Sequence, residues 1–131
     1  RGKGVPQNYA EAAKWYRRAA DHRLYQAQYS LGLMYKESQG VPQDFTEAAN
    51  WFRRAANQRY AKAQFQLGVM YQLGQGVSQD YNIALEWYHK AAEQGDSNAQ
   101  YNLGVLYQLG EGVSQDYSKS AKWYRKAAKR R

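Results

Sequence analysis

The chain of 131 residues contains no cysteine, so it can form neither a disulfide nor a thiolate-ligated metal site. It also lacks a long apolar run, whereas a transmembrane helix needs about 20 consecutive apolar residues. Residues Arg1 to Gly4 are not followed by the apolar stretch of a signal peptide. These absences predict no membrane span. They leave cytoplasmic, periplasmic and secreted locations all open, because an exported protein can also lack cysteine.

Residue types that carry chemistry are scarce. The two histidines, His22 and His89, are far apart, no His-x3-His pair occurs, and the acidic residues do not cluster. Because a metal site needs several such ligands together, we expect no metal and no cofactor. No serine begins the Ser-x-x-Lys motif of serine β-lactamases. A Ser-His-Asp triad assembles only in space, but the repeat described next accounts for every conspicuous residue, so we expect no catalytic residue.

What the sequence has instead is a strict 36-residue repeat. Its tryptophans are Trp15, Trp51, Trp87 and Trp123. Residues 4–9 (Gly-Val-Pro-Gln-Asn-Tyr) return with small changes at 40–45, 76–81 and 112–117. The pattern Ala-Gln-x-x-Leu-Gly-x-x-Tyr occupies 27–35, 63–71 and 99–107. No insertion disturbs the spacing, which indicates a tandem repeat. We interpret the tryptophans as packing residues; stacking platforms for nucleic-acid bases would need exposed rings.

Each unit is predicted to form two helices. In helix A (about 24–38, 60–73 and 96–109), Ala27, Leu31 and Tyr35 share one face. In helix B (about 7–21, 43–57, 79–94 and 115–129), the apolar residues follow the spacing of an amphipathic helix.

Two further positions recur within these helices. Asp44, Asp80 and Asp116 stand at the start of helix B, where a carboxylate can accept hydrogen bonds from free backbone N–H groups. Gly32 lies beside the apolar face of helix A, where glycine costs about 1 kcal/mol relative to alanine. We therefore expect a neighbouring backbone to come too close to Gly32 for a side chain.

A helical hairpin cannot bury its apolar face alone, so successive units should stack around one continuous core. We predict an all-α fold, a right-handed superhelical solenoid of antiparallel helix pairs with seven helices. Residues 1–131 are predicted to be a single solenoid domain, with a terminal helix B (1–23) and full repeats at 24–59, 60–95 and 96–131. Neither end has a polar cap. We therefore expect a segment of a longer array, with end-to-end association as an open alternative.

The repeat resembles the Sel-one-like repeat (SLR) family, a relative of tetratricopeptide repeats. The resemblance rests on Ala-x-x-Trp-Tyr-x-x-Ala-Ala, Ala-x-Ala-Gln-Tyr-x-Leu-Gly-x-x-Tyr and Gly-x-Gly-Val-x-Gln-Asp-Tyr, and residues 84–117 carry it most fully. It covers nearly the whole chain. It implies a solenoid similar to tetratricopeptide arrays and an adaptor, bacterial or eukaryotic; many bacterial relatives assist signalling, envelope assembly or host interaction.

The chain departs from the family pattern at three turns. Arg23 and Arg59 stand where Gly95 follows helix B, and Ser38 stands where the other two A-to-B turns have glycine. Glycine there usually forms a left-handed cap, so these junctions are expected to be either strained or differently shaped. Some family members carry a disulfide in each repeat and have been described as β-lactamases. The absence of cysteine and of the serine motif argues against that activity here.

The face of helix A opposite its core stripe carries apolar side chains in every unit, about 180° from Leu31. Its members are Gln26, Tyr29, Leu33, Lys36, Lys62, Phe65, Val69, Gln72, Asn98, Tyr101, Val105 and Gln108. One interpretation is packing against the next unit. The other follows from the resemblance, in which the A helices line a concave face where partners dock. Tyr29, Phe65 and Tyr101 would then form an apolar strip of the kind that interfaces favour.

Helix B has a basic residue in every unit. We call Arg18, Arg54, Lys90 and Lys126 the basic ladder; the position before it holds Arg17, Arg53, His89 and Arg125. Cations near a helix C-terminus are favourable by about 0.3–1 kcal/mol each, which offers a purely structural explanation. The functional interpretations are an acidic protein partner or nucleic acid. The net charge of +8 is uneven, with six basic and six acidic residues in 24–95, and this disfavours nucleic acid.

The predicted function is a non-catalytic scaffold or adaptor that binds a peptide segment or domain of another protein through the concave helix-A face. Two alternatives from other classes stay open. One is nucleic-acid or polyanion binding through the basic ladder, and the other is a β-lactamase-like enzyme. The sequence indicates neither the partner's identity nor the oligomeric state.

Overall fold

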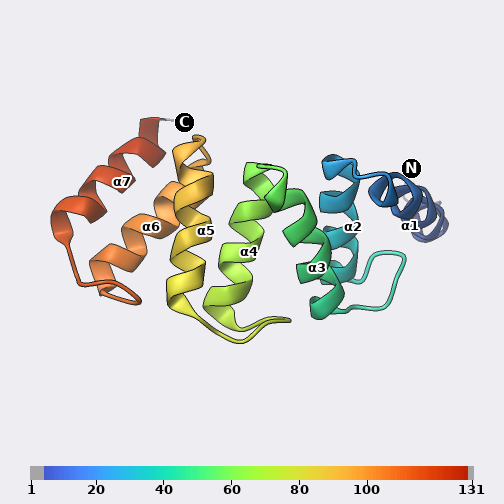
Figure 1. Cartoon of the computed structure of the whole chain (residues 1–131), viewed down its shortest axis with the longest axis horizontal. Helices are drawn as coiled ribbons and strands as arrows, with labels where there is room; N and C mark the ends of the chain where they lie inside the picture. Colours follow the sequence, from blue (N-terminus) through green and yellow to red (C-terminus); the bar gives the residue numbers. More distant parts are fainter. Residues whose placement is uncertain (1–4, 130–131) are drawn as a thin grey trace.

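A computed structural model describes residues 5–129, which form seven α-helices in a row (Figure 1). The helices are α1 (Val5–Asp21), α2 (Tyr25–Glu37), α3 (Phe45–Asn57), α4 (Ala61–Leu73), α5 (Tyr81–Glu93), α6 (Ser97–Leu109) and α7 (Tyr117–Lys129). Each packs against its neighbours in chain order. The all-α repeat solenoid predicted from the 36-residue period is confirmed. Residues 1–4 of the predicted terminal helix B (1–23) and residues 130–131 of the last predicted repeat (96–131) lie outside the described residues.

The predicted A helices are α2, α4 and α6, and the predicted B helices are α1, α3, α5 and α7. An aspartate precedes three of the B helices. The carboxylate oxygens of Asp44 and Asp80 accept a hydrogen bond from the backbone N–H three residues on at 3.1 Å, and that of Asp116 does so at 3.0 Å. The predicted capping role is therefore confirmed. Because Asp44 and Asp80 cap from extended backbone outside the helix, α3 and α5 begin two residues later than the sequence predicted, and α7 begins equally late, directly after Asp116.

The core runs without a break along the row. Leu31, Leu67 and Leu103, one on each A helix, are at most 1% exposed. The buried residues form three clusters in chain order, which contain Leu31, Leu67 and Leu103 respectively. Tyr35 packs against the first and second clusters, and Tyr71 packs against the second and third. These tyrosines join the units, because each one covers apolar atoms of its own unit and of the next.

Glycine in the middle of each A helix accommodates an aromatic ring of the B helix that follows. A Cβ atom on Gly32 would lie 2.7 Å from the ring of Phe52. On Gly68 it would lie 2.5 Å from the ring of Tyr88, and on Gly104 it would lie 2.7 Å from that of Tyr124. The expected crowding at Gly32 is confirmed, but the prediction that a backbone causes it is wrong. An aromatic side chain, not a backbone, occupies the space.

Three turns hold a non-glycine residue in left-handed backbone. Arg23, Ser38 and Arg59 have φ angles of 66°, 58° and 71°, in the region that Gly95 occupies at 98°. This backbone costs an L residue roughly 1–2 kcal/mol. The junctions therefore keep one shape and carry strain, and the alternative that they are differently shaped is wrong.

Buried glutamines stitch each B helix to the A helix after it. The Nε2 groups of Gln28, Gln64 and Gln100 donate to the backbone carbonyl eight residues earlier at 3.1–3.2 Å. Gln58 and Gln94 donate in turn to the Oε1 atoms of Gln28 and Gln64 at 2.9 Å. These bonds satisfy polar groups that would otherwise be costly to bury, and they link consecutive units.

The Gly68→Ala substitution is expected to destabilise the chain by about 1–2 kcal/mol, because overpacking against Tyr88 outweighs the roughly 1 kcal/mol that alanine gains in a helix. Urea unfolding measures this difference. Gly104→Ala is the matched control and should cost less, since Tyr124 is half-buried and lies on the last helix, where it can shift. An increase in stability for Gly68→Ala would contradict the proposed contact.

The Ser38→Gly substitution is expected to stabilise the chain by about 0.5–1 kcal/mol. Glycine removes the left-handed strain, and the larger backbone entropy that glycine loses on folding offsets only part of this gain in stability. Thermal melting tests this. Ser30→Gly, inside α2, should instead destabilise by about 1 kcal/mol. Equal losses for both variants would show that Ser38 carries no strain.

Candidate functional site

We use the term outer face for the side of α2, α4 and α6 that points away from their core stripe. This face contains the twelve residues singled out from the sequence, and they differ in exposure. Gln26, Lys62, Asn98, Tyr101 and Gln108 are exposed. Tyr29, Leu33, Lys36, Phe65, Val69, Gln72 and Val105 are half-buried. The face is therefore neither a sealed interior nor a plain solvent surface.

Each aromatic residue of this face rests against a ring of the following B helix. The ring centroids are 5.7 Å apart for Tyr29 and Phe52, and 5.9 Å apart for Phe65 and Tyr88. Tyr29 also meets Tyr60, at the start of the next unit, edge to face at 5.3 Å. These spacings are typical of favourable aromatic pairs. Residues at this position thus contribute to packing and still present part of their surface to solvent.

The polar end of the same face is tied into internal hydrogen bonds. The hydroxyl of Tyr88 donates to Gln72 at 2.6 Å, and the hydroxyl of Tyr124 donates to Gln108 at 2.7 Å. In the first unit Phe52 replaces the tyrosine, so it has no hydroxyl to offer. Lys36 stands there in place of the glutamine and donates to Gln66 at 2.9 Å. Burial raises the pKa of Tyr88 to about 12, so this donor stays protonated at neutral pH.

Two exposed leucines extend this face beyond the residues found from the sequence. Leu73 and Leu109 end α4 and α6, and each is 58% exposed. Tyr101, Val105 and Leu109 are spaced i, i+4 and i+8, so they form one stripe along α6. The same spacing was available in the sequence, but the leucines lie away from the strict 180° direction.

The basic ladder stacks on tryptophan. Each cation lies over the indole ring three residues earlier on its own helix: Arg18 over Trp15 at 5.4 Å, Arg54 over Trp51 at 4.5 Å, Lys90 over Trp87 at 5.5 Å and Lys126 over Trp123 at 4.8 Å. Contacts of this kind contribute about 0.5–1 kcal/mol at exposed sites. The four side chains are exposed, so the ladder is both a packing element and a row of basic groups on the surface.

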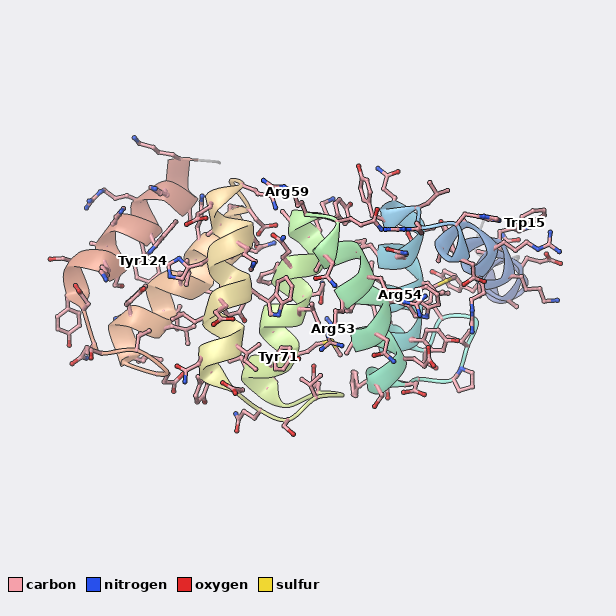
Figure 2. The ribbon with its side chains drawn as sticks, viewed as in Figure 1. Trp15, Arg53, Arg54, Arg59, Tyr71 and Tyr124 are labelled. Atoms are coloured by element: carbon pink, nitrogen blue, oxygen red, sulfur yellow. The ribbon has the colours of Figure 1, made fainter. Side chains whose placement is uncertain are left out.

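In the first three copies, the residue before the ladder position reaches into the next unit. Arg17 donates to the Tyr35 hydroxyl at 3.2 Å and lies 5.5 Å from the centroid of Trp51. Arg53 donates to the Tyr71 hydroxyl at 2.6 Å, and Figure 2 shows these side chains close together. The recurrent tryptophan is buried where such a neighbour covers it: Trp51 is 4% exposed and Trp15 is 64% exposed.

His89 takes the place of these arginines in the third copy. Its Nε2 atom lies 3.1 Å from the Tyr107 hydroxyl, and its ring meets Trp123 at 5.7 Å. Burial lowers the pKa of His89 below its ordinary value of 6.5, and the charges of Lys119 and Lys122 lower the pKa further, against the opposite effect of Glu93. The neutral imidazole is therefore the form that fits the folded chain.

Among residues 5–129, no group of three or more acidic or histidine side chains is placed to hold a metal ion. Within the same range, no helix is long and apolar enough to cross a membrane.

The stability of the chain is expected to fall as the pH is lowered from about 8 to about 5.5. His89 has a lower pKa folded than unfolded, so protonation below about pH 6.5 favours the unfolded state. His89→Arg, which restores the residue of the other copies, should flatten this dependence. Urea unfolding at both pH values measures it, with His22→Arg as the control. The same slope in wild type and His89→Arg would contradict the assignment.

The model of the Sel1 repeat matches residues 1–23, 26–60, 61–96 and 97–131. Among solved structures, the chain is similar to c5321, a protective antigen of uropathogenic Escherichia coli with an SLR fold, at 48% identity and a TM-score of 0.94, over 98% of this chain and 28% of that one. It is similar to a Sel1 repeat protein from Oxalobacter formigenes at 43% identity and a TM-score of 0.89, over 98% of this chain and 52% of that one.

A third structure, Helicobacter pylori cysteine rich protein B, has a TM-score of 0.74 at 22% identity and covers 98% of this chain and 92% of that one, which shows a shared fold. A comparison with curated proteins found no match.

The chain spans 28% and 52% of the length of its two more similar relatives. Sel1 repeat proteins are generally protein-interaction scaffolds without catalysis. The four matched segments follow the 36-residue period and leave almost no residue uncovered, so this chain belongs to the Sel1 repeat family.

Proposed function

We propose that this chain is a non-catalytic scaffold that binds a partner protein along the outer face of α2, α4 and α6, the face that is concave in the solenoids it resembles. One observation carries the proposal: apolar side chains on this face are left uncovered. Tyr101 is 51% exposed, and Leu73 and Leu109 are each 58% exposed. Tyrosine is among the residues that contribute most binding energy at protein interfaces, and the buried core of an interface is richer in apolar surface than its rim.

The uncovered apolar surface is concentrated on α4 and α6. On α2 the position equivalent to Leu73 is Glu37, and Tyr29 is half-buried against Phe52 and Tyr60. Phe65 and Val69 lie beside Leu73 at helical spacing and are half-buried. We therefore place the centre of the docking surface over α4 and α6 and its margin over α2.

A polar rim surrounds this apolar centre. Gln26, Lys62 and Asn98 are exposed at the first turns of α2, α4 and α6. Amide and basic groups there can donate to backbone carbonyls of a bound segment, as the polar rims of interfaces do. Gln72 and Gln108 accept hydrogen bonds from tyrosines of the chain itself, so we expect them to position rings and not the partner.

The double variant Leu73→Ser and Leu109→Ser tests this surface. Both side chains are largely exposed, so the free energy of unfolding should change by less than about 0.5 kcal/mol. Partner affinity should fall about tenfold or more. Affinity purification with the wild-type chain identifies a partner, and calorimetric titration of that partner against both proteins gives the change in Kd. Glu86→Ala with Lys122→Ala, exposed on α5 and α7, is the control.

Three outcomes would contradict the proposal. A partner that binds the leucine variant normally and is lost on Arg54→Ala with Lys90→Ala would use the basic ladder. Retention of single-stranded DNA at about 200 mM salt, with a steep salt dependence, would favour nucleic-acid binding. Nitrocefin hydrolysis that survives repurification would indicate an enzyme.

A further inference from the structure

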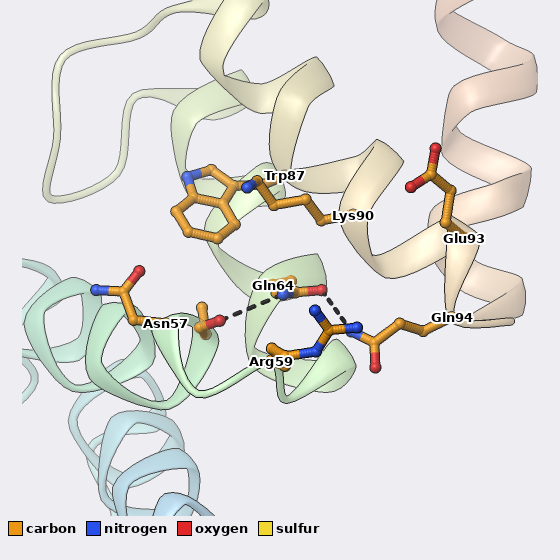
Figure 3. A pocket seen from close by; sticks show the side chains of 8 residues that line it. Asn57, Arg59, Gln64, Trp87, Lys90, Glu93 and Gln94 are labelled. Atoms are coloured by element: carbon orange, nitrogen blue, oxygen red, sulfur yellow. Dashed lines mark hydrogen bonds between the residues drawn. The ribbon is translucent and has the colours of Figure 1, made fainter.

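Two hollows of matching composition lie one repeat apart at the turns between B and A helices. The first, of about 370 Å³, is lined by Arg23, Gln28, Arg54 and Gln58 among others. The second, of about 270 Å³, is lined by the residues 36 positions later, Arg59, Gln64, Lys90 and Gln94 (Figure 3). Asn57 lines both hollows, which makes them neighbours on one edge of the solenoid.

The floor of each hollow is prebuilt from amide groups. In the second, Gln64 donates to the carbonyl of Ala56 at 3.2 Å and accepts from Gln94 at 2.9 Å (Figure 3). Gln28 and Gln58 repeat this arrangement in the first. These amide groups are already bonded within the chain, so a ligand would be bound mainly by the charged side chains that line each hollow.

Each hollow has two cations against one carboxylate. Arg59 and Lys90 line the second hollow together with Glu93, for a net charge of +1. Arg23 and Arg54 line the first together with Asp21. Lys90 is steadied over the ring of Trp87 at 5.5 Å, and Arg54 is steadied over its own tryptophan at 4.5 Å. The cationic groups are thus partly positioned before any ligand arrives.

The arginine on each hollow occupies a position whose backbone favours glycine. Arg23 and Arg59 have φ angles of 66° and 71°, and the third copy has Gly95 at this position. A left-handed arginine is retained twice at the mouth of a hollow although glycine is the less strained choice. Backbone strain of this kind is concentrated at functional sites, which suggests that the two arginine side chains have a function.

We propose that the two hollows bind carboxylate side chains of an extended acidic segment of a partner protein. A guanidinium recognises a carboxylate through two parallel N–H···O bonds, and the neighbouring ladder cation supplies a second charge. Asn57, between the hollows, offers an amide to the backbone of the bound segment. A nucleic-acid backbone fits less well, because its phosphates form a continuous row, whereas the positive charge here is confined to two hollows with a net charge of +1 each. The hollows lie at the turns before α2 and α4, whereas Leu73 and Leu109 lie at the C-terminal ends of α4 and α6.

A labelled peptide of about ten residues tests the proposal, since such a peptide spans about 33 Å when extended. It carries four glutamates, and a matched peptide carries glutamines. Fluorescence anisotropy at about 50 mM and about 200 mM salt gives Kd. The glutamate peptide should bind wild type about tenfold more tightly than the glutamine peptide, and Arg23→Gly with Arg59→Gly should remove this preference. Because glycine suits both positions, the variant should melt at or above the wild-type temperature.

Two comparisons separate a built site from general attraction. Lys14→Ala with Lys129→Ala removes the same charge from exposed positions outside the two hollows and should leave Kd within about twofold. Arg23→Gln with Arg59→Gln keeps a side chain at each turn and should lose binding as the glycine variant does. Equal losses in the lysine and arginine variants would overturn the proposal, as would tighter binding of single-stranded DNA of equal charge with the same arginine dependence. Leu73→Ser with Leu109→Ser should not affect the peptide, so this proposal and the scaffold proposal can fail separately.

Discussion

The contact between a helix glycine and an aromatic ring determines how this solenoid is built. Because Gly32, Gly68 and Gly104 have no Cβ, a ring of the following B helix can lie directly against the A-helix backbone. Phe52 and Tyr88 are completely buried by this arrangement. Any larger residue would push the two helices of a unit apart and open the core between them.

The same rings determine what the outer face of the A helices can offer. Where the ring is a tyrosine, as at Tyr88 and Tyr124, its hydroxyl engages a glutamine of the A helix. Where it is Phe52, the A helix has Lys36 instead, and this lysine bonds to the next A helix. The residue that supplies the ring and the A-helix residue that faces its outer end therefore change together between copies. The polar end of the face is used internally, and the apolar stripe of α4 and α6 is what remains for a partner.

On the B helices, positive charge and aromatic rings alternate. Each ladder cation covers the tryptophan of its own helix, and Arg17 covers Trp51 from the preceding unit. Cation–π contacts and inter-unit packing thus account for much of the basic composition. Arg23 and Arg59 stand apart from this pattern. They stack on no ring in the described residues, they occupy strained backbone, and they line the two hollows.

Local and repeated features could be read from the sequence alone. The 36-residue period, the two helices per unit and the aspartate caps depend on residues close together in the chain, and the family pattern at 84–117 adds the solenoid. Only the tertiary structure could identify the group that lies against Gly32, because a glycine inside a helix indicates a close neighbour but not which neighbour it is. Exposure within the outer face depended on it too: Tyr29 is half-buried because Tyr60 of the following unit lies against it, 31 positions later in the chain. Such exposure is set by contacts between units, and these join residues far apart in the chain, so only the tertiary structure decides it.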